Sequence, residues 1–143
     1  MTPQRISLVT LGVRDMVRSR AFYEALGWTP VASPPEVTFY RLDGMAMGLF
    51  GLDALANDQG RPDATLGTGA ITLAQNFPDK ESVDRSFRTA LAAGAKKLKD
   101  PEGVFWGGYS GYYADPDGHV WEVAYNPFWP IASGGQITIP DAP

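Results

Sequence analysis

The segment Gly111-Tyr-Tyr-Ala-Asp-Pro-Asp-Gly-His-Val-Trp-Glu-Val-Ala-Tyr125 joins two runs of aromatic and β-branched residues through the strongest turn signal in the chain. In the turn 115–118, proline presets φ at the second position and glycine tolerates a positive φ. The flanking runs alternate as half-buried strands do, so the segment predicts a β-hairpin. Its second strand places Val120, Glu122 and Ala124 on one face and Trp121, Val123 and Tyr125 on the other. Glu122 is therefore a single carboxylate within an otherwise apolar strand.

The chain outside this hairpin repeats one order of elements twice. We expect a strand at 6–13, a helix between the N-cap Asp15 and Gly27, and strands at 28–32, 37–42 and 45–50. The order returns with a strand at 70–74, a helix between Asp79 and Gly94, and strands at 95–99, 104–114 and 119–125. A repeated βαβββ unit predicts an α+β fold in one domain. We place repeat one at 5–52, a linker with a short helical turn at 53–69, repeat two at 70–126 and a tail with a small hairpin at 127–143.

Composition limits the class of protein. The 143 residues are 44% hydrophobic and 20% charged, as in soluble globular proteins, and no apolar run is long enough for a membrane span. The net charge of −4 argues against nucleic acid or anionic membrane partners, which bind clustered Lys and Arg. The absence of cysteine excludes disulfides and thiolate chemistry. The N-terminal segment carries no signal-peptide pattern, so we expect a cytoplasmic location.

The two faces of the predicted sheets differ in side-chain size. The larger residues, which we expect to pack under helices carrying Phe22 and Phe87, are Val9, Leu11, Met47, Leu49, Ile71, Leu73, Trp121 and Val123. The opposite face carries Thr10, Gly12, Ala46, Gly48, Ala70, Thr72, Ala74 and Glu122, with Leu8, Phe50 and Val120 as larger members. Small residues on a curved sheet leave room, so we interpret this face as a concave ligand cavity. The alternative is that loops or a partner chain fill it.

The segment 104–113 combines aromatic residues with three glycines beside the expected cavity. Alternation favours Trp106 and Tyr112 as residues that stack on a flat ligand. The alternative is that Phe105, Trp106 and Tyr113 pack within the sheet and that the glycines only shape bulges.

Four motifs in this order resemble the vicinal oxygen chelate superfamily, which includes glyoxalase I, bleomycin and fosfomycin resistance proteins and extradiol dioxygenases. They are Leu11-Gly-Val-Arg-Asp15, Ser19-Arg-Ala-Phe-Tyr23, Leu26-Gly-Trp28 and Asp115-Pro-Asp-Gly-His-Val-Trp-Glu-Val123, within about residues 5–126. The resemblance implies an incomplete eight-stranded barrel of two βαβββ units, commonly in homodimers, with the ligand in the concave sheet.

The resemblance also implies four positions from which enzymes of the superfamily hold a divalent metal. In this sequence they correspond to Leu8, Gly48, Ala70 and Glu122. Three of these residues have no donor atom, and one carboxylate does not complete a catalytic metal shell, so we expect neither a metal nor another cofactor. His119 follows a tight turn and alternates away from Glu122, so we interpret it as structural.

Glu122 has two interpretations. A carboxylate in an apolar cavity is desolvated, which raises its pKa and suits a general acid or base. The alternative is a purely structural carboxylate whose hydrogen bonds are satisfied locally. The ligand-binding residues that we expect are Leu8, Thr10, Gly48, Phe50, Ala70, Thr72, Trp106, Tyr112 and Glu122, and Glu122 is the candidate catalytic residue.

Three functions follow from these observations. The first is a metal-free homodimer that binds a small, partly aromatic molecule. The second is a lyase, isomerase or dioxygenase of the same superfamily, with Glu122 as base or as the sole remaining metal ligand. The third is a structural interaction domain, in which the aromatic tail serves dimerisation.

Overall fold

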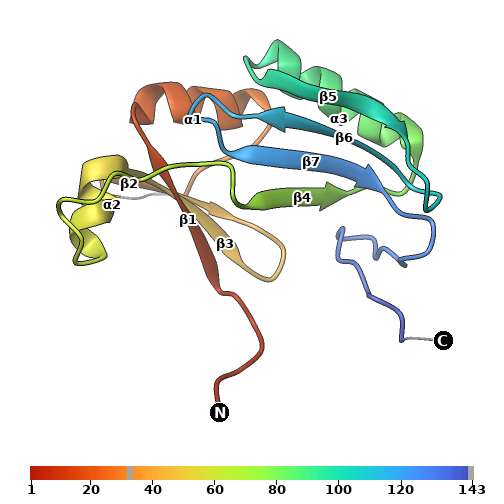
Figure 1. Cartoon of the computed structure of the whole chain (residues 1–143), viewed down its shortest axis with the longest axis horizontal. Coiled ribbons are helices and arrows are strands. Elements are labelled where there is room, and N and C mark those ends of the chain that lie inside the picture. Colours follow the sequence, from red (N-terminus) through yellow and green to blue (C-terminus); the bar gives the residue numbers. More distant parts are fainter. Residues whose placement is uncertain (32–33, 142–143) are drawn as a thin grey trace. The chain divides into compact units, whose positions relative to one another are not determined.

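The structure, a computed structural model, describes residues 1–31 and 34–141 (Figure 1). The described part contains β1 (Leu8–Val13), α1 (Met16–Ala25), β2 (Val37–Arg41), β3 (Ala46–Gly51), α2 (Leu52–Asp58), β4 (Thr72–Asn76), α3 (Lys80–Ala92), β5 (Lys96–Gly103), β6 (Tyr109–Ala114) and β7 (Val120–Tyr125). The chain divides into two compact units, an N-terminal unit (Met1–Gly67) and a C-terminal unit (Thr68–Pro143). Each unit contains one open sheet, so the α+β class is confirmed.

The N-terminal unit contains a three-stranded sheet in the order β1-β3-β2, with β1 parallel and β2 antiparallel to β3. Helix α1 begins after Asp15, whose Oδ1 accepts a hydrogen bond from the Arg18 backbone N–H at 3.1 Å. Gly27 ends the helical segment with φ of 96°, a conformation in which a side chain is disfavoured. The buried residues of this unit include Leu11, Val13, Phe22, Tyr23, Tyr40, Met47 and Leu49.

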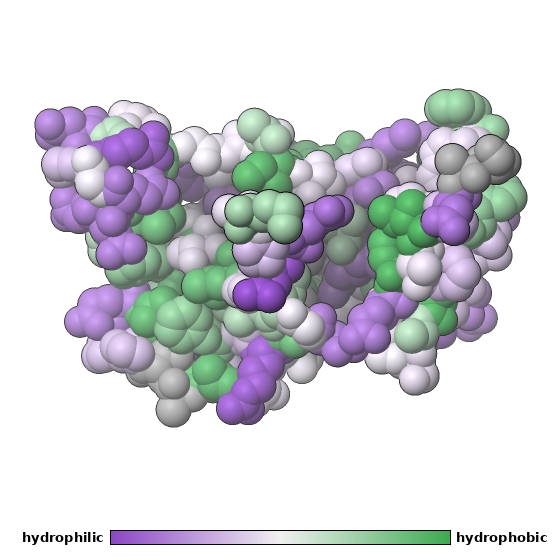
Figure 2. Space-filling model, turned by 90° about the horizontal axis from the view of Figure 1, so that it is seen from below, coloured by the Kyte–Doolittle hydropathy of each residue, from purple (hydrophilic) through white to green (hydrophobic). Residues whose placement is uncertain are grey.

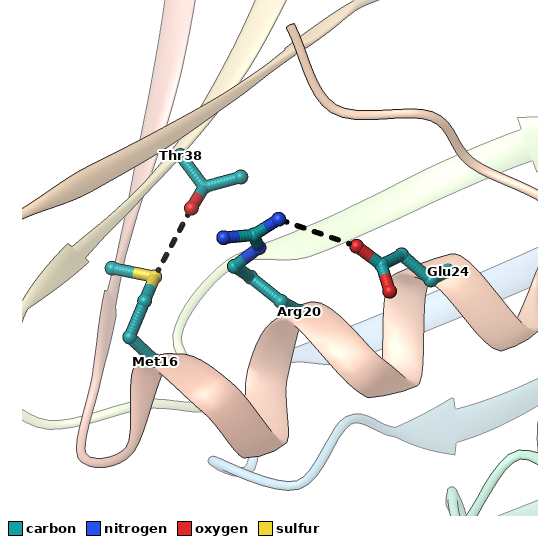
Figure 3. Close-up of polar contacts among 4 residues, drawn as sticks. All are labelled: Met16, Arg20, Glu24 and Thr38. Atoms are coloured by element: carbon teal, nitrogen blue, oxygen red, sulfur yellow. Dashed lines mark hydrogen bonds and ion pairs between the residues drawn. The ribbon is translucent and has the colours of Figure 1, made fainter. Parts of the chain in front are cut away.

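Polar contacts add to this packing at both ends of α1. Figure 3 shows the Thr38 hydroxyl pointing to Met16 Sδ at 3.3 Å, which links β2 to the first turn of the helix. Arg20 Nη2 lies 3.5 Å from Glu24 Oε1 on the same helix (Figure 3). Both side chains of that ion pair are about half exposed, so the pair adds little stability.

The C-terminal unit contains a four-stranded sheet in the order β4-β7-β6-β5. Helix α3 begins after Asp79, whose Oδ1 accepts a hydrogen bond from the Ser82 backbone N–H at 2.7 Å. Its buried side chains recur at helical spacing, as predicted, and are Val83, Phe87 and Ala90. They belong to the same core as Tyr113, Trp121 and Val123 of the sheet.

The hairpin on which the sequence analysis began is confirmed. Strands β6 and β7 pair antiparallel around the predicted turn, where the Gly118 N–H donates to the Asp115 carbonyl at 3.0 Å. Asp115 Oδ1 also accepts from the backbone N–H groups of Asp117 and His119, at 3.0 and 2.9 Å. The buried Asp115 carboxylate therefore closes the turn itself.

Two predicted strands of the C-terminal unit begin at least two residues later than expected. The strand predicted at 70–74 is β4, which starts at Thr72 because its first ladder partner, Val120, is the first residue of β7 after the turn. Ala70 and Ile71 precede the ladder, and Ile71 is 72% exposed rather than part of the core. The strand predicted at 104–114 begins at Tyr109, because Gly107, with φ of 99°, turns the preceding residues into a loop.

Other predictions were wrong in detail. The strand predicted at 28–32 is reduced to an isolated bridge between Val31 and Phe39, and residue 32 lies outside the described residues. The described residues form seven strands in open sheets, one fewer than the incomplete eight-stranded barrel that the resemblance implies, because the strand predicted at 28–32 is only this bridge. Strand β5 extends past Pro101, which an edge strand tolerates because its outer N–H groups need no ladder partner. In α1, Ser19 and Tyr23 are buried, whereas the apolar Val17 is 80% exposed.

No helix among the described residues is long and apolar enough to cross a membrane. Exposed apolar side chains are instead distributed along both units, and the larger ones include Ile6, Val17, Ile71, Phe105 and Phe128. Figure 2 shows hydrophobic patches interspersed with hydrophilic ones on the face that it presents.

Candidate functional site

Glu122 lies at the third position of β7, directly opposite Tyr112 of β6 in the antiparallel ladder. The carboxylate is half-buried. Burial raises the pKa of the Tyr112 phenol, and the charge of Glu122 and a hydrogen bond from the phenol to that carboxylate raise it further. The two side chains therefore form a polar pair across the ladder.

The surface around this pair consists mostly of small side chains. Register and alternation place on one side of the sheet Thr72, Ala74 and Asn76 of β4, Ser110, Tyr112 and Ala114 of β6, and Val120, Glu122 and Ala124 of β7. We call this surface the Glu122 face. The opposite side carries Tyr109, whose hydroxyl donates to Asp84 of α3 at 2.6 Å, so it is the side that the helix covers.

Trp106 reaches the Glu122 face from the loop between β5 and β6. Its six-membered ring lies where a Cβ on Gly108 would stand, at 1.9 Å from that position, so a side chain at Gly108 would displace the ring. Gly108 precedes Ser110 and Tyr112 at strand spacing, which places the indole on their side of the sheet. Trp106 is 41% exposed, whereas the neighbouring Phe105 is fully exposed and Phe128 of the tail lies against Gly107.

On the corresponding surface of the N-terminal unit, larger side chains cover two glycines. We call it the Gly48 face, and its register pairs place together Leu8, Thr10 and Gly12 of β1, Ala46, Gly48 and Phe50 of β3, and Val37, Phe39 and Arg41 of β2. The ring of Phe39 lies over Gly48, because a Cβ there would be 3.2 Å from Phe39 Cε1. Leu52 of α2 covers Gly12 in the same way, because its Cδ2 atom lies 2.6 Å from the position that a Cβ on Gly12 would take.

Ladder register fixes which positions correspond between the two units. Gly48 pairs with Thr10, and Glu122 pairs with Ala74, each as the third residue of its strand. Leu8 and Thr72 likewise begin their strands. The structure therefore places Thr72, rather than Ala70, at the position that corresponds to Leu8.

The side chains at these four positions do not fit a catalytic metal. Leu8 and Gly48 have no donor atom, Thr72 offers a neutral hydroxyl, and only Glu122 is anionic. Among residues 1–31 and 34–141, no three His, Cys, Asp or Glu side chains are grouped so that they would hold a metal ion. The donor set thus departs from the metal chemistry that the sequence resemblance implies.

The predicted ligand-binding residues fall on both units. Leu8, Thr10, Gly48 and Phe50 belong to the Gly48 face, and Thr72, Trp106, Tyr112 and Glu122 belong to the Glu122 face, whereas Ala70 is exposed before β4. Phe39 was missed by the sequence analysis. The hairpin around the turn at 43–44, extended by alternation, would have placed this aromatic residue opposite Gly48.

The described surface also has a half-open hollow of about 370 Å³ in the N-terminal unit, which none of the predicted residues lines. It is bounded by Gly27, Trp28, Thr29, Tyr40, Arg41 and Leu42. The Tyr40 hydroxyl is buried and has no hydrogen-bond partner among the described residues. Burial, and then the charge of Glu24, raises the pKa of Tyr40, while Arg20 opposes this rise.

The chain is similar to one protein family and to several solved structures. The family model for the Glyoxalase/Bleomycin resistance protein/Dioxygenase superfamily matches residues 5–123. The structure of a glyoxalase-related enzyme from Fulvimarina pelagi is 37% identical, with a TM-score of 0.90, over 96% of this chain and 99% of that chain. A glyoxalase/bleomycin resistance protein/dioxygenase family enzyme from Burkholderia phytofirmans PsJN is 25% identical, with a TM-score of 0.73, over 83% and 96%. A lactoylglutathione lyase from Agrobacterium tumefaciens, 24% identical with a TM-score of 0.67 over 90% and 98%, shares the fold. No curated protein matches the chain.

Proposed function

Because the chain belongs to the glyoxalase, bleomycin resistance protein and dioxygenase superfamily, we propose that it binds a small, partly aromatic organic molecule without a metal ion. The Glu122 face supplies the binding groups in this proposal. The observation that carries it is the Tyr112–Glu122 pair, which lies beside small side chains and on the same side of the sheet as the Trp106 ring. An apolar surface with a few convergent polar groups is the usual composition of a small-molecule site.

The metal-free part of the proposal rests on donor chemistry. A neutral threonine hydroxyl and one carboxylate are the only donors at the four positions that correspond to the superfamily's metal ligands. Elemental analysis of protein purified without chelator should find less than stoichiometric Zn, Ni, Fe or Mn. A stoichiometric transition metal that is lost on Glu122→Gln would contradict this part.

Ligand binding is tested by a thermal-shift screen of small aromatic compounds, run with and without EDTA. A compound at 100 times its Kd should stabilise the protein by about 2.7 kcal/mol, and EDTA should not change the shift. Trp106→Ala should weaken the response, while Phe105→Ala is the matched control because Phe105 is a fully exposed neighbour. A broad library without hits would favour a structural interaction domain.

A second candidate is an isomerase or lyase in which Glu122 accepts a proton from the bound molecule. The Tyr112 hydroxyl favours it, since a hydrogen bond from a neighbouring phenol fixes the orientation of a carboxylate base. Once a ligand is known, turnover that survives Glu122→Gln would dismiss this candidate.

The proposal includes a homodimer in the cytoplasm. Exposed aromatic side chains such as Phe105 and Phe128 support association, because aromatic residues are enriched at protein interfaces. Light scattering should give twice the chain mass of 15.5 kDa. A mass of one chain at micromolar concentration would contradict the dimer, and cell fractionation tests the location.

A further inference from the structure

We propose that the Glu122 face selects organic cations that carry a flat aromatic group at a distance from a protonated amine. The amine would bind to Glu122, and the aromatic group would pack against Trp106. This inference rests on the proposed function and names the class of ligand for the same surface. Three features of the C-terminal unit lead to it. They are the charge of Glu122, the hydrogen-bonding capacity of its carboxylate and the distance along the sheet between Glu122 and Trp106.

The first feature is the charge of Glu122. No Lys, Arg or His among the described residues lies in ion-pair distance of this half-buried carboxylate. The nearest cation by ladder register is Lys99, opposite Tyr112, but its Nζ lies 3.1 Å from Glu102 on its own strand. A cationic ligand would supply the counter-charge that the protein does not.

The second feature is the hydrogen-bonding capacity left at the carboxylate. An ionised carboxylate offers about four lone-pair sites, and Tyr112, its neighbour across the ladder, has one hydroxyl and can use at most one of them. An ammonium group has donors but no acceptor, so it matches the remaining sites, and charge-assisted hydrogen bonds are stronger than neutral ones. A ligand carboxylate would instead face Glu122 with acceptors only.

The third feature is the distance between Glu122 and the indole. The ring of Trp106 lies on Gly108, and Gly108 precedes Tyr112 by about 13 Å of extended strand, at ~3.3 Å per residue. The small residues Ser110 and Ala124 pair with each other between these two ends. The two groups are therefore separated by several residues of strand, a separation that a molecule with a ring and an amine at opposite ends would bridge and that a compact cation would not.

The inference is tested with 4-phenylbutylamine, 4-phenyl-1-butanol and 4-phenylbutyrate, which share a ring and differ in the charge of the far end. Calorimetric titration of the full chain should show that the amine binds at least about tenfold more tightly than the alcohol, as expected for a charge-assisted bond. The carboxylate should bind most weakly. Butylamine, which lacks the ring, should bind at least about tenfold more weakly than phenylbutylamine.

Variants assign the selectivity to residues. Glu122→Gln should abolish the preference for the amine over the alcohol, and Trp106→Ala should weaken both about equally. Glu102→Gln is the matched control, because it removes an exposed carboxylate of the adjacent strand that already pairs with Lys99. Unchanged thermal unfolding of Glu122→Gln shows that the variant is folded.

The outcomes separate the two proposals. Equal affinity for amine and alcohol, or a preference that Glu122→Gln does not change, overturns the cation selectivity while a loss on Trp106→Ala still supports aromatic ligand binding. Absence of binding by all three probes overturns the inference, whereas the broad thermal-shift screen decides the proposed function independently.

Discussion

In the N-terminal unit Phe39 of β2 faces Gly48 of β3, and in the C-terminal unit Tyr112 of β6 faces Glu122 of β7 at the corresponding place. Both pairs place an aromatic ring beside the third residue of the central partner strand. Glycine lets the Phe39 ring lie over the backbone, whereas Glu122 places a carboxylate beside the Tyr112 phenol. One pairing pattern thus gives an aromatic ring over glycine in one unit and a phenol beside a carboxylate in the other.

The difference shows that the strand pairing specifies the fold and that single residues decide the chemistry at each position. A phenylalanine needs no polar partner, so a glycine opposite it is sufficient. A tyrosine that is partly removed from water needs an acceptor, and Glu122 provides one. Exchanging these residues is therefore the most direct way to test the comparison.

The largest effect is expected from Gly48→Glu, which places the carboxylate of the C-terminal unit in the N-terminal one. Its Cβ would stand 3.2 Å from the Phe39 ring, and its carboxylate would be attached at a buried position. We expect a loss of roughly 3 kcal/mol in the free energy of unfolding, measured by urea denaturation. The reciprocal Glu122→Gly should cost about 1 kcal/mol, since it leaves one phenol without its acceptor. Equal losses would contradict the comparison.

Phe39→Ala should have the next largest effect. The half-buried ring covers Gly48, so its removal exposes that backbone and should lower the free energy of unfolding by about 2 kcal/mol. Tyr112→Phe, the control in the other unit, removes only a hydroxyl and should cost less than 1 kcal/mol. A smaller loss for Phe39→Ala than for Tyr112→Phe would show that Phe39 does not fill the N-terminal face.

Replacing Tyr40 and Tyr109 with phenylalanine should change the free energy of unfolding in opposite directions. The Tyr40 hydroxyl is buried without a partner among the described residues, so Tyr40→Phe should raise the free energy of unfolding by about 1 kcal/mol. The Tyr109 hydroxyl donates to Asp84 at 2.6 Å, so Tyr109→Phe should lower it by about 1 kcal/mol. Chemical denaturation of both variants measures the difference, and a destabilised Tyr40→Phe would indicate a partner for that hydroxyl.

The smallest effect concerns alkaline pH. Burial, the charge of Glu122 and the hydrogen bond to it raise the pKa of Tyr112 from its ordinary value of 10.0. Because the folded state holds this proton more tightly than the unfolded state, the associated stability is present below pH 10.0 and is lost as the pH rises through the raised pKa. In Glu122→Gln, ultraviolet titration should show a lower Tyr112 pKa that still exceeds 10.0, because burial persists. An unchanged Tyr112 pKa in Glu122→Gln would show that Glu122 does not contribute to the raised pKa.

The helix ends and the central hairpin could be predicted because their signals are local. Asp15, Asp79 and the turn 115–118 act on backbone groups within four residues, so they depend little on the rest of the fold. The start of β4 could not be predicted in the same way, since the ladder begins where Val120 leaves the turn, far away in sequence.

The site was predictable in composition but not in its details. Alternation placed Glu122 and Tyr112, because the hairpin fixes their register. The position of the Trp106 ring depends on the bend at Gly107 and on Gly108, which alternation within a regular strand does not include. The filling of the Gly48 face by Phe39 depends on tertiary pairing as well as on the small size of Gly48.

The central claim is that the Glu122 face of the C-terminal unit binds the ligand. Two-dimensional NMR of the labelled protein during titration with 4-phenylbutylamine tests it most directly. We predict that the largest shifts occur at the backbone amides of Tyr112 and Glu122 and at the Trp106 indole N–H. Shifts confined to β2 and β3 of the N-terminal unit, with none at these three groups, would contradict the account.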